Sequence, residues 1–155
     1  MNANPIPAQL DCDLYDHEIT WLPFAGMENL ELSLFDFDEE RGVVDLIVRF
    51  APNKTVTMHN HLAQTNMMII QGELRMYEPD GSIREARPAG RYYRGTTGDT
   101  HSEGGGPEGA VVFYSMRCDD NPEVVEVMDD DGNVQATLTM DDVRAAWAAQ
   151  QASTA

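Results

Sequence analysis

The chain has 155 residues, of which 42% are hydrophobic, and its 27 acidic residues outnumber its 10 basic residues, giving a formal net charge of −17. This length and composition predict one folded domain, residues 1–155, and exclude a disordered chain. So acidic a surface repels phosphate backbones and anionic lipids, and we therefore expect neither nucleic acid nor a membrane as a partner.

The sequence shows no targeting or membrane signal. Its first residues lack the basic start and the apolar stretch of a signal peptide, and no apolar run is long enough to span a bilayer. The two cysteines, Cys12 and Cys118, lie far apart and form no C-x-x-C pattern. We therefore expect a cytoplasmic protein with two free thiols, although a disulfide between them stays open.

Short runs with strand character follow an irregular arm at residues 1–20. In ENLELSLFDF, leucines alternate with Glu31 and Ser33, which is the period of a half-buried strand. Glycines and prolines separate the runs, as at the turn signal Pro79-Asp80-Gly81-Ser82. Regular short strands of this kind predict an antiparallel barrel or sandwich over residues 28–118. The predicted strands cover residues 28–37, 42–50, 55–61, 66–71, 73–77, 82–87 and 110–116, residues 87–95 hold another turn and a strand, and residues 102–107 form a glycine-rich loop.

The C-terminal part of the chain predicts a hairpin followed by a helix. Residues 119–139 contain two runs rich in β-branched residues around an Asp-Gly pair, which favours a tight turn. Residues 139–152 are rich in alanine, and Thr139 with Asp142 has the spacing of a helix-capping box. A valine and a tryptophan four residues apart give this helix one face that can pack on the barrel.

Two histidines, His59 and His61, stand one residue apart in a predicted strand. Residues two apart on a strand project from the same face, so both imidazoles can reach one metal ion. His101, which comes shortly before the last barrel strand, is the candidate for a third ligand. The fourth histidine, His17, lies in the arm and has no comparable setting. The alternative is that the three barrel histidines are structural and hydrogen-bonded.

These histidines lie in two stretches that resemble the two cupin motifs. His59-Asn60-His61, followed by Gly72, resembles the first motif, and Pro88-Ala89-Gly90, followed by His101, resembles the second. The resemblance implies an all-β cupin jelly-roll barrel, here extended by the C-terminal hairpin and α-helix, that holds one divalent metal ion. Because cupins host many different reactions, the fold alone does not identify the chemistry.

The glutamate that follows the histidine pair in many cupins is absent, and Gln64, Thr65 and Asn66 stand in its place. The chain thereby resembles the three-histidine cupins, which include the acetylacetone (β-diketone) and 2,4'-dihydroxyacetophenone dioxygenases. The diketone enzymes also carry a glutamate shortly before their third histidine, where this chain has none. The C-terminal stretches that resemble those enzymes are Asp130-Asp131-Gly132-Asn133-Val134 and Ala145-Ala146-Trp147-Ala148.

This resemblance implies a non-haem Fe(II) dioxygenase that cleaves a C–C bond in a small β-diketone or hydroxyketone. His59, His61 and His101 would hold the metal, and a ketone or carboxylate substrate would chelate it before dioxygen reacts. Zn(II) and Ni(II) stay open as the native metal. The surrounding candidates are Gln64, Thr65 and Asn66 as partners of a water at the metal, Met58, Met67 and Ile69 as pocket lining or plain core, Arg75 and Arg94 as substrate-binding or solvent-exposed cations, and Glu103 as an extra ligand, an outer hydrogen-bond acceptor or a solvated loop residue.

Two other functions stay open. One is a non-oxidative cupin, a hydrolase, lyase or isomerase in which Zn(II), Ni(II) or Mn(II) acts as a Lewis acid. The other is a non-catalytic sensor of a metal or small ligand, as in the ChrR-type anti-sigma cupin domains, although we expect no N-terminal helical domain to hold a sigma factor. Because cupins commonly pair through edge strands and exchanged arms, we also expect a homodimer or a larger homo-oligomer.

Overall fold

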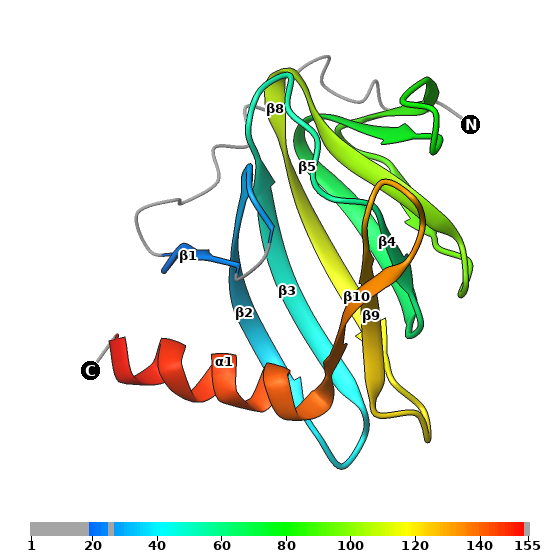
Figure 1. Cartoon of the computed structure of the whole chain (residues 1–155). Coiled ribbons are helices and arrows are strands. Elements are labelled where there is room, and N and C mark those ends of the chain that lie inside the picture. The colour runs from blue at the N-terminus through cyan, green and yellow to red at the C-terminus, as the bar shows by residue number, and fades with distance from the viewer. Residues whose placement is uncertain (1–18, 25–26, 154–155) are drawn as a thin grey trace, which may run out of the picture.

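The computed structural model describes residues 19–24 and 27–153, which form one curled sheet with a single helix beside it (Figure 1). The predicted antiparallel all-β architecture is confirmed as a curled half-barrel, and so are the C-terminal hairpin and helix, but β5 and β8, with 14 and 18 residues, are longer than the short strands predicted. The elements are β1 (Leu22–Pro23), β2 (Leu30–Asp38), β3 (Val43–Phe50), β4 (His59–His61), β5 (Gln64–Tyr77), β6 (Ile83–Pro88), β7 (Tyr92–Arg94), β8 (Thr100–Arg117), β9 (Glu123–Met128), β10 (Val134–Thr139) and α1 (Met140–Ser153).

The strand order is β1-β2-β3-β8-β4-β9-β10, and β5 pairs with the other side of β8 while also carrying β6 and β7. We call β1, β2, β3, β5, β6, β7 and most of β8 the large sheet, and β4, β9 and β10 the small sheet. The start of β8 joins the two through two residue pairs, His59 with His101 and Asn60 with Thr100. The strand β8 therefore belongs to both sheets.

The inner face of the large sheet forms the core. On β3, for example, Val44, Leu46 and Val48 point inward and are buried, as the alternating pattern predicts. One polar residue departs from this pattern, because Ser33 on the outward face of β2 is only 3% exposed. Gln150 of α1 covers it, with the Ser33 hydroxyl 3.5 Å from the Gln150 side-chain oxygen.

The glycine-rich stretch at 102–107 is part of β8, so the predicted loop is wrong there. The glycines are needed because the chain at 51–55 crosses β8 at very close range. A Cβ at Gly104 would lie 2.0 Å from the Lys54 carbonyl oxygen, and one at Gly105 would lie 2.6 Å from that of Ala51. Sequence reasoning took the glycines as loop formers, whereas here they allow close backbone approach within a strand.

Two further strand predictions need correction. The strand predicted at 55–61 is regular only over β4, and Thr55 forms an isolated bridge to Gly104. The strands predicted on either side of Gly72 are one strand, β5, which continues through a bulge. Gly72 has φ 69° and lies so close to Gly109 that a Cβ would come within 2.2 Å of the Gly109 carbonyl oxygen, so the position requires glycine.

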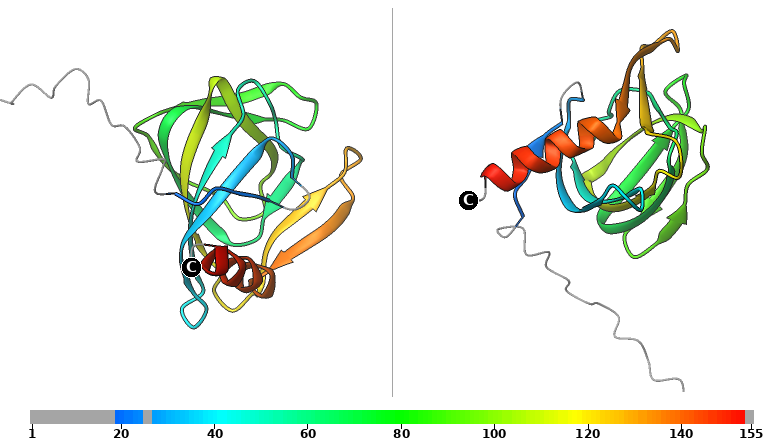
Figure 2. Two further views of the ribbon diagram at one scale, coloured as in Figure 1. Left: turned by 90° about the vertical axis from the view of Figure 1, so that its left-hand side faces the viewer. Right: turned by 90° about the horizontal axis from the view of Figure 1, so that it is seen from below.

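The C-terminal helix runs along one side of the curled sheet, where it contacts β2 and β10 (Figure 2). One half of its predicted capping box is present, because the Asp142 carboxylate accepts the backbone N–H of Thr139 at 2.8 Å, and it also accepts the Thr139 hydroxyl at 2.8 Å. Farther along α1, the Gln150 side chain bonds both the N–H and the carbonyl of Leu34, at 2.9 and 2.8 Å. The helix thus provides hydrogen-bond partners for the unpaired backbone groups of Leu34 at the edge of β2.

Some sequence predictions fall outside the described residues. Most of the predicted arm at 1–20 does so, together with Cys12 and His17. Cys118 is described, and it is a buried free thiol whose pKa is raised by burial. Among the described residues, no helix is long and apolar enough to cross a bilayer.

Candidate metal centre

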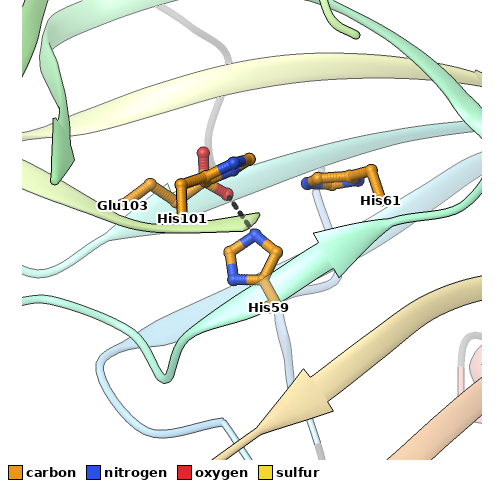
Figure 3. A group of neighbouring side chains, drawn as sticks. All are labelled: His59, His61, His101 and Glu103. Atoms are coloured by element: carbon orange, nitrogen blue, oxygen red, sulfur yellow. Dashed lines mark ion pairs between the residues drawn. The ribbon is translucent and has the colours of Figure 1, made fainter. Parts of the chain in front are cut away.

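Three histidines and one glutamate converge inside the curled sheet (Figure 3). His59 and His61 project from the same face of β4, and His101 lies directly opposite His59 at the start of β8. Two residues along β8, Glu103 projects from the same face as His101. One ligand atom from each of the four side chains lies within 4.8 Å of the others, and all four residues are buried.

The outer nitrogens of the three imidazoles have backbone or hydroxyl partners, so the inner nitrogens are the ones left to face one another, His59 Nε2 lying 3.6 Å from Glu103. The Nδ1 atoms of His59 and His101 lie 2.9 Å from the carbonyl oxygens of Thr57 and Asp99. A carbonyl only accepts, so Nδ1 carries the proton in both rings. The Nδ1 of His61 lies 3.2 Å from the Thr65 hydroxyl, which donates in turn to the Ala63 carbonyl at 3.1 Å. The same tautomer is therefore favoured in all three.

The Nε2 atoms of His61 and His101 are buried without a hydrogen-bond partner among the described residues. An unpaired buried nitrogen is costly, because it has lost water and gained nothing in exchange. A divalent metal ion between the rings would accept these lone pairs. The set of three imidazoles and one carboxylate suits Zn(II), Ni(II) or Fe(II), so the residues present fit one such ion.

Burial and mutual repulsion keep two of the rings neutral, which is the form that binds a metal. Burial, followed by the nearby charge of His59, lowers the pKa of His61 to about 3. Burial is also the main cause that lowers the pKa of His101. Neutral His61 and His101 need not lose a proton before they coordinate an ion.

Glu103 forms the acidic part of the cluster. Its Oε1 lies 3.6 Å from His59 Nε2, and its Oε2 accepts a 2.9 Å hydrogen bond from the Tyr114 hydroxyl. Burial alone would raise the pKa of this carboxyl, but the His59 hydrogen bond and the charges of the three histidines lower it to about 2. Burial opposes protonation of His59, yet the Glu103 carboxylate raises its pKa overall. Without a metal, these two residues form a buried ion pair.

A cavity of about 130 Å³ lies next to this cluster. His59, His61, Glu103 and Tyr114 line it at one end, and apolar side chains of β2, β3, β9 and α1 line most of the rest. Among the described residues, none from β5 lines the cavity. A small molecule placed there would meet the metal cluster at one end and apolar walls elsewhere.

A family model described as the ChrR cupin-like domain matches residues 13–117. The chain belongs to this cupin family. No curated protein matches the chain by sequence comparison.

Solved structures with the same fold include two acetylacetone dioxygenases. One, from Acinetobacter johnsonii, is 15% identical with a TM-score of 0.70, and the match covers 97% of this cupin and 98% of that chain. The other, described as a candidate enzyme of that kind from Methylibium petroleiphilum, is 16% identical with a TM-score of 0.69, covering 96% and 99%. An RmlC-like cupin from Ralstonia eutropha is 17% identical with a TM-score of 0.70, covering 89% and 85%. At these identities the likeness shows the fold.

The structure brings five of the residues selected from the cupin sequence into one cluster. His59, His61 and His101 form its centre, Thr65 bonds His61, and Glu103 faces His59. Glu103 is only 4% exposed, so its interpretation as a solvated loop residue is wrong. The inward-facing glycine-rich strand explains its burial.

The other selected residues of the cupin lie away from the cavity. Met67 and Ile69 are buried in the core on β5, and Met58 is half-buried. Arg75 pairs with Glu73 at 2.7 Å on the outward face. The remaining placements are Gln64, which donates to the Gly95 carbonyl at 2.8 Å, Asn66, whose side-chain oxygen is 3.5 Å from Gln64, and Arg94, which is exposed.

Sequence reasoning missed Tyr114 and the α1 residues of the cavity wall. Tyr114 lies in the predicted strand 110–116 and is 2% exposed, with its hydroxyl pKa raised well above the usual value by burial and by Glu103. Its inward phase was readable from the alternation with Val112 and Met116. Its pairing with Glu103, eleven residues earlier, depends on the bend of β8 and left no sequence signal.

Proposed function

We propose that this cupin binds one divalent metal ion through His59, His61 and His101 and that, with Fe(II), it acts as a dioxygenase. Its substrate would be a small β-diketone or hydroxyketone, cleaved at a C–C bond beside the carbonyl. The observation that carries the proposal is the set of three buried imidazoles whose outer nitrogens are engaged and whose inner nitrogens converge beside an apolar cavity.

The chain's own residues would orient the site and keep water out. Thr57, Thr65 and Asp99 hold the imidazole rings, while Tyr114 holds the Glu103 carboxylate. The apolar cavity walls would exclude water from the reacting ketone. When bound, Fe(II) would supply the chelation of the substrate and the reactivity toward dioxygen. The two dioxygenases of the same fold support this choice of chemistry.

The experiment measures metal content and oxygen uptake together. Protein purified without a metal-affinity column should contain about one metal ion per chain, and His101→Ala should lose it. The Fe(II)-loaded protein should consume dioxygen with β-diketones or hydroxyketones, whereas the mutant should not. A fully Fe(II)-loaded protein that consumes no dioxygen across both ketone classes would contradict the dioxygenase.

A second candidate is a non-oxidative cupin that holds Zn(II), Ni(II) or Mn(II), either as a Lewis-acid enzyme or as a sensor. The observation that favours it is Glu103, because three imidazoles and a carboxylate can fill four coordination positions, as in closed zinc sites. Tightly retained zinc and activity that persists without oxygen would support the enzyme. Tightly retained zinc with ligand binding but no turnover would support the sensor.

We further propose a cytoplasmic homo-oligomer, in which the buried Cys118 thiol stays reduced.

An apolar row on the outward face of the large sheet supports the oligomer. Phe35, Met68 and Tyr92 are 48%, 41% and 64% exposed, and the Phe35 ring stacks on Phe113 at 6.3 Å. The molar mass from light scattering should correspond to at least a dimer. The substitution Met68→Glu should shift the protein toward the monomer. A wild-type monomer would contradict the oligomer.

A further inference from the structure

The C-terminal part of the chain supplies part of the apolar cavity wall. Leu138 at the end of β10 and Val143 and Ala146 on α1 line it, and all three pack against the core. Phe24 and Met27, near β1, also line it. The helix is therefore part of the site, although it lies outside both cupin motifs and contributes no candidate ligand.

The charges around the cavity disfavour an anionic occupant away from the metal. None of the described lining residues is a lysine or arginine, whereas Glu103 and Asp142 are acidic. The net charge of −17 adds to the same effect. A carboxylate or phosphate facing α1 would lose water and gain no cation in exchange. The part of a ligand that contacts α1 must therefore be neutral.

The space within the cavity indicates the size of the neutral group that it can surround. Its volume is about 130 Å³. An apolar protein cavity of about 150 Å³, lined by similar aliphatic and aromatic residues, stays dry and binds benzene. A phenyl ring or a branched alkyl group of about six carbons is therefore the size that fits between the cluster and α1.

We propose that this cupin takes a ligand with a neutral apolar group of about benzene size against α1 and a polar end at the histidine cluster. Ala146 and Val143 set the size limit of the apolar group. The polar end rests on the proposed metal-binding function, whereas the apolar group does not. The proposal narrows the substrate to ketones with one bulky neutral substituent and excludes those whose substituent carries a negative charge.

The first part of the test uses a matched pair of probes on Zn(II)-loaded protein, which does not turn them over with dioxygen. The probes are 1-phenylbutane-1,3-dione and the same diketone with a carboxylate at the para position of the ring. Calorimetry should show binding of the neutral probe and at least ~100-fold weaker binding of the charged one. Equal affinities would overturn the proposal.

The second part uses toluene, which cannot chelate a metal, on protein with and without Zn(II). Ala146→Leu should fill the cavity and weaken toluene binding at least ~10-fold, with unchanged zinc content. Val143→Ala should instead admit a larger probe, naphthalene. The control is Ala148→Leu on the exposed side of α1, which should bind toluene as the wild type does.

The outcomes separate the two proposals. Protein that binds toluene in an Ala146-dependent way but retains no metal would refute the metal function and keep the cavity assignment. Protein that retains zinc but binds neither toluene nor the neutral diketone would refute the cavity assignment alone. Toluene binding that Ala146→Leu leaves unchanged, while Val143→Ala admits no naphthalene, would also refute it.

Discussion

Thr65 stands where many cupins have a metal-binding glutamate, and here its hydroxyl bonds the ring of His61. Its hydroxyl accepts from His61 Nδ1 and donates to the Ala63 carbonyl, so it fixes the ring that would face the metal. Thr65→Val keeps the shape but removes the hydroxyl. We expect metal affinity to fall by about 10–100-fold, as for other partners of ligating histidines. Competition with a chromophoric chelator measures the change.

Thr65→Ser is the matched control, because it keeps the hydroxyl and should retain most of the affinity. Equal affinities for the valine and serine variants would show that the Thr65 bond does not hold His61 in place. Circular dichroism should show the same fold in both variants, so that the difference reports the site.

At the residue scale, the sequence located the members of the histidine cluster better than the residues around it. The spacing of His59 and His61 predicts both rings on one face, and His101, shortly before the last barrel strand, is the third candidate, which the resemblance to the second cupin motif supports. The sequence leaves the role of Glu103 open, because the glycine-rich stretch at 102–107 predicts a loop. Glu103 is buried because this stretch is part of strand β8. The position of the apolar cavity, beside β3 and α1, could not be predicted. The alternation along a strand indicates which residues face inward, but not where the packed side chains leave space.

At the element scale, substitution of the β8 glycines should destabilise the fold strongly. A Cβ at Gly104 would lie 2.0 Å from backbone oxygen, which can move only with the whole crossing segment. We expect Gly104→Ala to lower the free energy of unfolding by about 2–3 kcal/mol and to weaken metal binding, because Glu103 is the preceding residue. Chemical denaturation and metal titration measure the two effects.

Gly106→Ala is the comparison for this prediction. The nearest atom to its Cβ would be a Glu73 side-chain oxygen at 2.9 Å, and that side chain can move away. Its loss of stability should therefore be clearly smaller. Equal losses for the two variants would mean that the crossing at Lys54 is not the cause.

One amide side chain bonds α1 to the edge of β2. Gln150 bonds both backbone groups of Leu34, and it is only 6% exposed. Gln150→Leu keeps the volume but leaves a buried N–H and carbonyl without partners, which costs about 1–3 kcal/mol each when water cannot replace them. We expect a lower melting temperature and faster exchange of the Leu34 amide. Ala148→Ser on the exposed side should change neither, and an unaltered Leu34 amide in Gln150→Leu would contradict the assignment.

The element boundaries show which sequence signals were reliable. Alternation and turn residues located β2, β3 and β6, and the capping box located the start of α1. The same signals misjudged β8, because glycine marks both loops and crowded strands. The contact of α1 with β2 was unpredictable, since a glutamine that bonds a strand edge has no distinguishing pattern in sequence.

At the scale of the whole molecule, the cluster joins the two sheets. The pairing of β4 with β8 consists of two residue pairs, and three of the four cluster residues lie in or directly beside it. We expect metal removal to raise hydrogen exchange in β4, β9, β10 and α1 while β2, β3 and β5 stay protected. His101→Ala with metal present should reproduce the pattern of the metal-free protein. Uniform loss of protection in both sheets would contradict this prediction.

If a metal ion binds at the cluster, the two-pair junction between the sheets would make the stability of the folded state depend on the concentration of free metal. An ion that binds the folded chain but not the unfolded one stabilises it by mass action. Above the dissociation constant, each tenfold rise in free metal would add about 1.4 kcal/mol to the stability of the metal-bound form. The share of chains with the small sheet docked on the large sheet would then follow the cell's free-metal concentration, just as the population of any linked complex follows its ligand.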